Sequence, residues 1–236
     1  SYVDLIFPEL QYLFKSGIHT KSCYALLKTE SNPDRIAKMH LTRLSNLLKK
    51  TSKGHYTKNH AIALKELASQ SVGIKDDTLS LQILQSIEQI EMYTQQISKV
   101  EASISEIMDC LDSVIKTIPG IGNLNGAMII GEIGDISRFE KPCQLLAYAG
   151  LDPSVYQSGK FTAARTRMSK RGSKLLRYAL INAAWQLTLN NETFKAYYDL
   201  KTSQGRRHYN ALGHVAHKLV RVIHKMMTDN RVFDLD

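Results

Sequence analysis

Apolar residues recur every three or four positions along most of the chain, which is the spacing of one face of an α-helix. Helix-start signals accompany the pattern, as in Ser31-Asn32-Pro33-Asp34, where polar residues precede a proline in the first turn. No segment alternates apolar and polar residues convincingly enough to predict a strand. The sequence therefore predicts an all-α fold, with helices over 3–14, 41–50, 57–70, 77–116, 141–148, 174–189, 192–205 and 208–229.

The longest periodic segment runs from Asp77 to about Lys116 without a proline or glycine. Its seam positions are three and four residues apart: Ile87, Ile90, Thr94, Ile97, Glu101, Ile104, Met108, Leu111 and Ile115. This heptad pattern predicts a long coiled-coil-like arm. We expect a homo-oligomer formed through the arm, and the alternative is that the seam packs on the chain's own helices.

A glycine-rich turn, Ile118-Pro119-Gly120-Ile121-Gly122, separates two helical patterns. Glycine lets a backbone approach a phosphate closely, and the N-terminus of a following helix adds a positive dipole. The segment 117–135 is similar to a helix-hairpin-helix, in which Gly120 and Gly122 would donate backbone N–H groups to DNA. An ordinary hairpin of two helices with a Pro-Gly turn is the alternative.

Composition narrows the class of protein. The chain has 236 residues, 43% of them apolar, which is enough for one or two domains with a hydrophobic core. No apolar run is long enough to span a membrane, and the N-terminus has no signal-peptide pattern. The absence of an initiator Met suggests a fragment of a longer protein. Three scattered cysteines, Cys23, Cys110 and Cys143, favour a reducing compartment, and we expect all three to be buried.

The positive charge is concentrated in the C-terminal third. The whole chain has a net charge of +9, yet the stretch from Ser154 to Lys225 has fourteen Lys or Arg against two acids, Glu192 and Asp199. That stretch alone carries +12, so the remainder carries −3. A localised basic surface is typical of nucleic-acid binding, and a solvated basic face is the alternative.

The residues from Gly150 to Arg177, GLDPSVYQSGKFTAARTRMSKRGSKLLR, have no carboxylate after Asp152, and we call them the basic segment. Ser158 lies near its centre, followed by a glycine and many cations. A serine hydroxyl attacks a phosphodiester when a base or a metal activates it and cations stabilise the charge that develops. Ser158 is therefore a candidate nucleophile, although a turn or capping role is the alternative for any serine in such a segment. Ser154, Ser169 and Ser173 have the sequence context of turns and caps, and Thr162 is a further hydroxyl.

The last predicted helix carries a basic face. His214, Lys218, Arg221 and Lys225 are separated by four, three and four residues, so they share one side. A surface that follows phosphates is the favoured interpretation, and Arg206, Arg207 and Tyr209 extend it. A metal site with His217 and His224 is disfavoured, because no Cys, Asp or Glu is close and cations are mixed in. Trp185, on an apolar helix, is expected to lie in the core.

The order of motifs in the C-terminal half carries a resemblance to a known family. GLDPSVYQSGKF followed by RMSKRGSKLLR, after IPGIG, GEIGDISRF and QLLAYAGLDP, resembles the C-terminal domain of the DEDD-type insertion-sequence transposases, relatives of the Piv DNA invertase. FPEL and the long helix are similar to the linker region of that family. The ordered set GLDP, QSG and SKRG is specific, whereas each motif alone is not.

The resemblance implies DNA transposition through a phosphoserine intermediate, with Ser158 as the matching catalytic serine. It also implies a RuvC-like domain whose four acidic residues bind Mg²⁺. No residues here match that tetrad, so we expect no cofactor in this chain and no recombination by the chain alone. Some members of the family are guided by an element-encoded RNA, which makes RNA a second candidate partner beside the DNA of element ends and target.

The sequence therefore predicts three parts: a helical linker region (1–75), a long coiled-coil helix (76–116) and a serine-bearing, helix-hairpin-helix-like domain (117–236). The expected catalytic residues are Ser158, Arg165, Arg167, Lys170 and Arg171. The expected DNA-binding residues are Gly120, Gly122, Gly159, Lys160, Arg177, Arg206, Arg207, His214, Lys218, Arg221 and Lys225. A non-catalytic DNA-binding and oligomerisation module is the alternative function, and a coiled-coil adaptor is a third. The expected location is the prokaryotic cytoplasm, at the nucleoid when bound to DNA.

Overall fold

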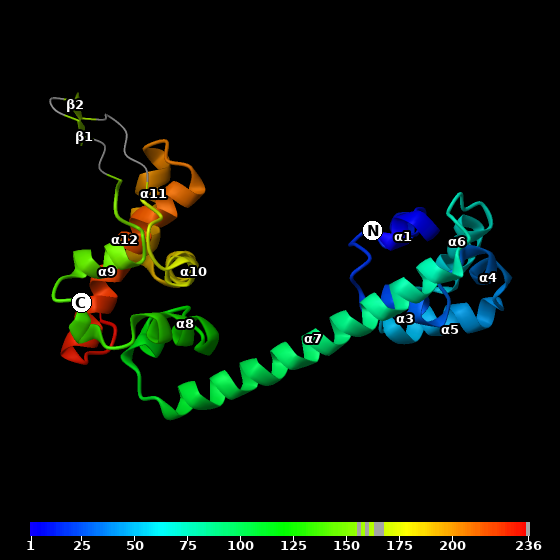
Figure 1. Cartoon of the computed structure of the whole chain (residues 1–236), viewed down its shortest axis with the longest axis horizontal. Coiled ribbons are helices and arrows are strands. Elements are labelled where there is room, and N and C mark those ends of the chain that lie inside the picture. The colour runs from blue at the N-terminus through cyan, green and yellow to red at the C-terminus, as the bar shows by residue number, and fades with distance from the viewer. Residues whose placement is uncertain (155–156, 159–160, 163–167, 235–236) are drawn as a thin grey trace. The chain divides into compact units, whose positions relative to one another are not determined.

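The computed structural model describes residues 1–154, 157–158, 161–162 and 168–234, and these residues are mostly helical (Figure 1). The all-α fold class is confirmed. The chain forms two compact units, Ser1–Ser98 and Lys99–Asp236. Across the described part, no helix is long and apolar enough to cross a membrane.

The first unit is built from short helices and the beginning of a long one. They are α1 (Tyr2–Ile6), α2 (Leu10–Leu13), α3 (Lys21–Thr29), α4 (Pro33–Lys38), α5 (Leu41–Thr51), α6 (Lys58–Ser69) and α7 (Asp77–Cys110). Helix α6 packs against α2, α4 and α5, and α3 also packs against α5. Their buried faces form one core, which includes Phe7, Phe14 and Leu64, and α7 adds Ile83 and Ile87.

Two expectations for this unit need correction. The single helix expected over 3–14 is divided into α1 and α2. Pro8 lies at the break, where its missing N–H and the steric restriction that it places on Phe7 interrupt a helix. Helix α3 was not predicted; its N-cap is Thr20, whose hydroxyl accepts a hydrogen bond from the N–H of Cys23 at 3.3 Å.

Helix α7 begins in the first unit and ends in the second, at Cys110 rather than near residue 116. Ser113 instead caps a 3₁₀ helix, η1 (Val114–Thr117), by accepting from the N–H of Ile115. The ends of the heptad seam are covered by the chain itself, at Ile87 and Met108. Residues 92–103 between them are exposed, including Ile97 at 57%.

The second unit has α10 at its centre. After η1 it consists of α8 (Asn123–Ile133), the 3₁₀ helix η2 (Ile136–Arg138), α9 (Pro142–Tyr148), α10 (Lys174–Asn190), α11 (Glu192–Ser203) and α12 (His208–Asp229) (Figure 1). Helix α10 contacts α8, α11 and α12, and α12 also contacts α9. Buried residues of α10 such as Leu176, Leu180 and Leu187 join Leu219 and Ile223 of α12 in the core.

A short strand pair lies in the basic segment, where the sequence predicted no strand. Strand β1 (Gln157–Ser158) pairs antiparallel with β2 (Phe161–Thr162), so that Ser158 is opposite Phe161. Two residues per strand are too few for hydrophobic alternation to show in the sequence. This pair does not change the fold class.

Candidate functional site

The two ends of the basic segment are fastened to each other by backbone hydrogen bonds. The N–H of Ser169 donates to the carbonyl of Asp152 at 2.8 Å, and the N–H of Lys170 donates to the carbonyl of Gly150 at 3.0 Å. Pro153 and Met168 also form an isolated antiparallel bridge. The motifs GLDP (150–153) and SKRG (169–172) are thus joined to each other, and we call this pairing the base of the basic segment.

Glycine is required at this base because the backbone at Gly150 passes close to Arg171 and the backbone at Gly172 passes close to Tyr148. Gly150 has φ +65°, and a Cβ there would lie 2.6 Å from the carbonyl oxygen of Arg171. Gly172 has φ +123°, and a Cβ there would overlap the carbonyl group of Tyr148. Both values of φ are ones that side chains larger than glycine rarely adopt. The two motif glycines therefore have a structural reason independent of any ligand.

The hydroxyls at the base already have hydrogen-bond partners. Ser169 donates from Oγ to Oδ1 of Asp152 at 2.5 Å and accepts from the N–H of Arg171. Ser173 donates to Oε2 of Glu132 at 2.5 Å and caps α10 by accepting from the N–H of Leu176. These contacts agree with the turn and capping roles that the sequence indicated for the two serines.

The proposed nucleophile, Ser158, lies in β1, and the structure describes its backbone pairing with Phe161. Four of the predicted site residues, Gly159, Lys160, Arg165 and Arg167, lie outside the described residues.

The described cations of the basic segment differ in their surroundings. Lys170 and Arg171 are exposed, and Lys170 has φ +54°, a left-handed conformation that is uncommon for a side-chain-bearing residue. Arg177 is half-buried and donates from Nη1 to the carbonyl of Ala149 at 3.0 Å. Arg177 thus ties α10 to the end of α9, so it has a structural role at the base in addition to its charge.

The two glycines of the turn between η1 and α8 have different surroundings. Gly122 is exposed, is the N-cap of α8 and has open space around its Cα. Gly120 has φ +82°, and a Cβ there would lie 2.8 Å from Cβ of Gln186 on α10. Gly120 therefore permits the turn to pack on α10, whereas Gly122 leaves the first turn of α8 accessible.

Helix α12 carries all four residues of the predicted basic face. Lys218, Arg221 and Lys225 are exposed, and His214 is half-buried. Lys218 lies over the ring of Tyr197, with Nζ 3.7 Å from the ring centroid. Lys225 pairs with Asp229 at 2.6 Å. The face is therefore present, with one of its cations partly neutralised.

The remaining histidines of α12 make structural hydrogen bonds. Nε2 of His217 donates to the carbonyl of Leu151 at 2.6 Å, and Nε2 of His224 donates to the carbonyl of Phe139 at 2.7 Å. Through His217, α12 is attached directly to the base of the basic segment. In the part of the chain that the structure describes, no three His, Cys, Asp or Glu side chains come together in a way that could hold a metal ion.

Positive charge around His214 affects its protonation. Its pKa lies below the ordinary value; burial is the largest cause, and electrostatic repulsion from Lys201, Arg206 and His217 lowers the pKa further. Arg206 and Arg207 are exposed in the connection between α11 and α12. Lys201 was not among the predicted residues, because it is separated in sequence from the face of α12.

Trp185 and two cysteines are less buried than the sequence indicated. Trp185 is 36% exposed, because α10 packs its other face into the core. Cys110 and Cys143 are exposed, and Cys23 is buried as expected. Cys110 is the last residue of α7, and Cys143 lies in the first turn of α9, where helix ends remain open to solvent.

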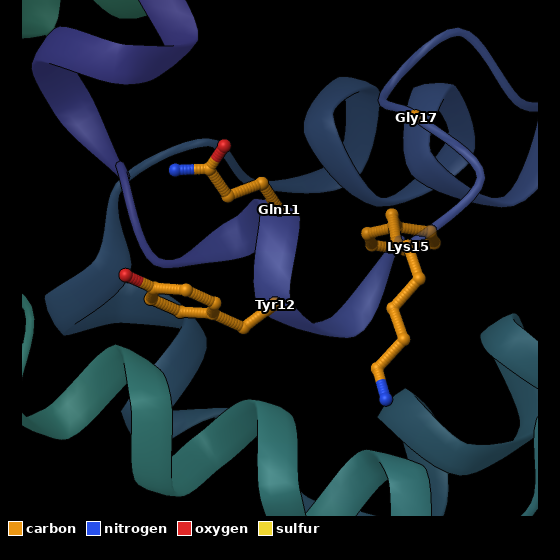
Figure 2. A pocket seen from close by; sticks show the side chains of 5 residues that line it. Gln11, Tyr12, Lys15 and Gly17 are labelled. Atoms are coloured by element: carbon orange, nitrogen blue, oxygen red, sulfur yellow. The ribbon is translucent and has the colours of Figure 1, made fainter.

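A shallow hollow of about 580 Å³ lies in the first unit, and none of the predicted site residues lines it. Its lining is Gln11, Tyr12, Phe14, Lys15 and Gly17. Figure 2 shows the side chains of Gln11 and Tyr12 extending to the left and that of Lys15 extending downward, so the three do not meet at one point. This lining contains one cation and no carboxylate, and among these described residues no side chain forms a hydrogen bond or ion pair with another.

Comparison with known proteins assigns a class to the region that contains this site. Residues 112–199 match the model of the family described as Transposase IS116/IS110/IS902 family. The transposase for insertion sequence element IS1111A of Coxiella burnetii is 31% identical over 176 residues, which are 71% of this chain and 47% of that protein. The pilin gene-inverting protein of Moraxella bovis is 26% identical over 152 residues, which are 61% of this chain and 47% of that protein.

A third relative is the insertion element IS110 uncharacterized 43.6 kDa protein of Streptomyces coelicolor, 27% identical over 143 residues, or 59% of this chain and 35% of that protein. The chain thus spans about a third to a half of the length of these relatives. Residues 112–199 are therefore similar to a transposase domain of insertion sequences, and pilin gene-inverting proteins are among the relatives of the chain.

Proposed function

We propose that this chain is the DNA-binding and catalytic-serine portion of an insertion-sequence transposase of the DEDD type. The match of residues 112–199 to the transposase model carries the proposal, because this span contains the entire basic segment with Ser158. The fastened base supports it, since a nucleophile is most effective when its surroundings are held by rigid elements. The substrates are the DNA of the element ends and of the target.

In the proposed reaction, Oγ of Ser158 attacks a backbone phosphorus. A bond forms between Oγ and phosphorus, the bond from phosphorus to one deoxyribose oxygen breaks, and the serine proton ends on that leaving oxygen. Cations stabilise the additional negative charge of the transition state; these are Arg165, Arg167, Lys170 and Arg171. A second strand's hydroxyl then attacks the phosphoserine and releases the serine, so no oxidant or reductant is consumed.

DNA would be held by backbone and side-chain contacts on several elements. Gly122 at the exposed start of α8 and Gly120 in the preceding turn would offer N–H groups to a phosphate, as in a helix-hairpin-helix. The basic face of α12, with Arg206 and Arg207, would follow the phosphates. Gly159, Lys160 and Arg177 complete the proposed set.

The proposal includes a magnesium-binding acidic domain, and the described residues do not supply it. No group of three potential metal ligands lies together in them, and the metal-binding residues are proposed to belong to that acidic domain.

We also propose that the exposed apolar seam of α7 pairs with a second copy of the chain, which would cover Ile97 and its neighbours. An element-encoded guide RNA is a further proposed partner.

The decisive test looks for the covalent intermediate. The whole protein that the gene encodes is incubated with element-end DNA and Mg²⁺ and denatured, and the linked residue is mapped by mass spectrometry in wild type and in Ser158→Ala. We expect an adduct on Ser158 that disappears in the variant, while Ser169→Ala, whose hydroxyl bonds to Asp152, still forms it. An adduct on Ser154, Thr162 or Ser169 would show that the nucleophile is wrongly assigned. DNA cleavage without an adduct would exclude the serine mechanism.

Salt dependence separates DNA binding from incidental charge. For duplex DNA, the logarithm of the binding constant should fall linearly with the logarithm of salt concentration, with a slope set by the number of phosphates contacted. Binding with this slope but without any adduct would favour the non-catalytic DNA-binding module. A flat response would contradict an electrostatic interface altogether.

A further inference from the structure

Four aromatic rings meet where α10, α11 and the start of α12 come together. The ring centroids of Trp185 and His208 are 5.0 Å apart, those of Trp185 and Tyr198 are 6.1 Å apart, and those of His208 and Tyr209 are 5.1 Å apart. The hydroxyl of Tyr198 is 2.7 Å from Nδ1 of His208. We call Trp185, Tyr198, His208 and Tyr209 the ring cluster.

The ring cluster is exposed to solvent, unlike a cluster of rings in a hydrophobic core. Tyr209 is 75% exposed and Trp185 is 36% exposed, and His208 is also exposed. The rings meet edge to face, at interplanar angles of 65° to 83°, so none of these pairs forms a parallel stack. A flat group from outside could therefore stack on a ring without replacing an existing stack.

Several cations lie beside the ring cluster in the chain or over the neighbouring ring of Tyr197. Arg206 and Arg207 directly precede His208 in the chain, and both are exposed. Lys201 and Lys218 approach the ring of Tyr197, next to Tyr198, with Nζ atoms 5.3 and 3.7 Å from its centroid. From residue 195 to residue 225 the chain has seven Lys or Arg and a single acid, Asp199. Burial is the main reason that the pKa of His214 is lowered, and repulsion from Lys201 and Arg206 lowers it further.

The exposed flat rings and the nearby cations together indicate which kind of ligand binds at the ring cluster. A protein partner that covered the rings would also have to supply carboxylates for Arg206 and Arg207, because an unpaired charge buried in an interface is costly. An unpaired nucleotide strand offers one flat base and one phosphate per residue, which match the rings and the cations at once. In duplex DNA the bases stack on each other, so their faces are not available.

We propose that the ring cluster, with Arg206 and Arg207, is a stacking site for unpaired nucleotides of single-stranded DNA. The proposal rests on the proposed function and deepens it, since strand cleavage and exchange leave nucleotides without their complementary partners. The cluster would hold such nucleotides by stacking on Trp185 and Tyr209, while the two arginines bind the flanking phosphates.

The chain contains one tryptophan, so its fluorescence reports on Trp185 alone. The 236-residue chain is titrated with an eight-nucleotide oligothymidylate, with an abasic strand of the same length, with a duplex of the same length and with oligouridylate. We expect strong quenching by oligothymidylate, little by the abasic strand and little by the duplex. Equal quenching by the abasic strand would overturn stacking, and tighter binding of oligouridylate would overturn the assignment to DNA.

Variants test the contribution of single rings, with binding of labelled oligothymidylate followed by anisotropy. Tyr209→Ala removes the most exposed ring of the cluster and should weaken binding at least fivefold, the low end of the effect of losing one base–aromatic stack. Trp185→Leu should weaken it at least as much. Tyr12→Ala is the matched control, because Tyr12 is a comparably exposed tyrosine, at 65%, in the first unit. An unchanged affinity in both cluster variants would contradict the proposal.

Two further results separate this inference from the proposed function. If duplex DNA binds with a steep salt dependence and the adduct forms on Ser158, yet oligothymidylate does not quench Trp185, the stacking site alone is wrong. If the fluorescence of Trp185 changes with protein concentration in the absence of DNA, a second copy covers the ring cluster, and this too overturns the proposal.

Discussion

Each unit of this protein contains an edge-to-face cluster of aromatic rings, but the two clusters lie in opposite environments. In the first unit, the ring centroids of Phe14 and Tyr56 are 5.3 Å apart at 70°, and those of Tyr56 and His60 are 5.3 Å apart at 78°. The pair of Trp185 and His208 in the second unit has nearly the same geometry, 5.0 Å at 83°. Yet Phe14 is 1% exposed, whereas Trp185 is 36% exposed.

The difference lies in what surrounds the rings. Tyr56 lies in the core of the first unit, where burial raises the pKa of its hydroxyl and Cys23 raises it further. Around Trp185 the neighbouring rings are those of Tyr198 and His208, and the exposed Arg206 and Arg207 directly precede His208 in the chain. The same ring geometry therefore stabilises the fold in one unit and leaves ring faces accessible in the other. The following predictions test this contrast.

The largest expected effect concerns Cys23, which lies in the same core as Phe14. Burial raises the pKa of the Cys23 thiol to about 12, from 9.0 in the absence of the protein environment. Since the thiolate is the reactive form, its population at pH 8 should be about a thousandfold smaller than for an unperturbed thiol. Alkylation followed by mass spectrometry should label the exposed Cys110 and Cys143 quickly and leave Cys23 unlabelled in the folded chain. Rapid labelling of Cys23 would contradict its burial.

The next effect is on stability. Phe14→Ala should lower the free energy of unfolding by about 3–5 kcal/mol, because it removes a buried aromatic ring and leaves a cavity beside Tyr56. Urea unfolding followed by far-UV circular dichroism measures the loss. Tyr12→Ala, two positions earlier and 65% exposed, is the control and should change stability by less than about 0.5 kcal/mol. Similar losses for both variants would contradict the assigned core.

The sequence predicted the helices that carry local signals. Asn32 caps α4 as expected, by accepting from the N–H of Asp34 at 2.9 Å, and Pro33 occupies its first turn. The helical spacing of apolar residues likewise located α5, α6 and α12. Helix α3 was missed because it is short and its buried face, Ser22, Cys23, Leu26 and Leu27, begins with a serine and a cysteine, which give a weak apolar pattern.

The environment of Trp185 depends on long-range packing, which local patterns do not encode. Helix α10 is apolar on both faces: Leu176 and Leu187 are buried, whereas Tyr178 and Leu189 are 60% and 59% exposed. Periodicity alone cannot tell which face the rest of the fold covers. The closed base of the basic segment is likewise long-range, since it joins Asp152 to Ser169. The motifs indicated where the site is, but not how its ends are held.

The ring cluster of the second unit should contribute less to stability than the buried rings. Trp185→Ala should cost about 1–2 kcal/mol, within the ordinary range for single substitutions, because the ring is partly exposed but still contacts Tyr198 and His208. Tyr209→Ala should change stability by less than about 0.5 kcal/mol. Far-UV circular dichroism is the appropriate measurement, since Trp185→Ala removes the only tryptophan. A loss of 3 kcal/mol or more for Trp185→Ala would mean that this ring belongs to the core, as the sequence first indicated.

The smallest effect concerns the protonation of His214, whose pKa is influenced by Lys201 and Arg206. NMR titration should give a pKa below 6.5, because burial and then the charges of Lys201 and Arg206 disfavour the protonated form. The unfolded chain therefore binds this proton first as the pH falls, so stability should decrease below pH 6.5, and His214→Gln should reduce that decrease. Oligothymidylate should raise the pKa, because its phosphates offset the nearby positive charge, whereas uncharged thymidine should not. If bound oligonucleotide left the pKa of His214 unchanged, its phosphates would lie away from Arg206. The two ring clusters would then differ only in how deeply their rings are buried.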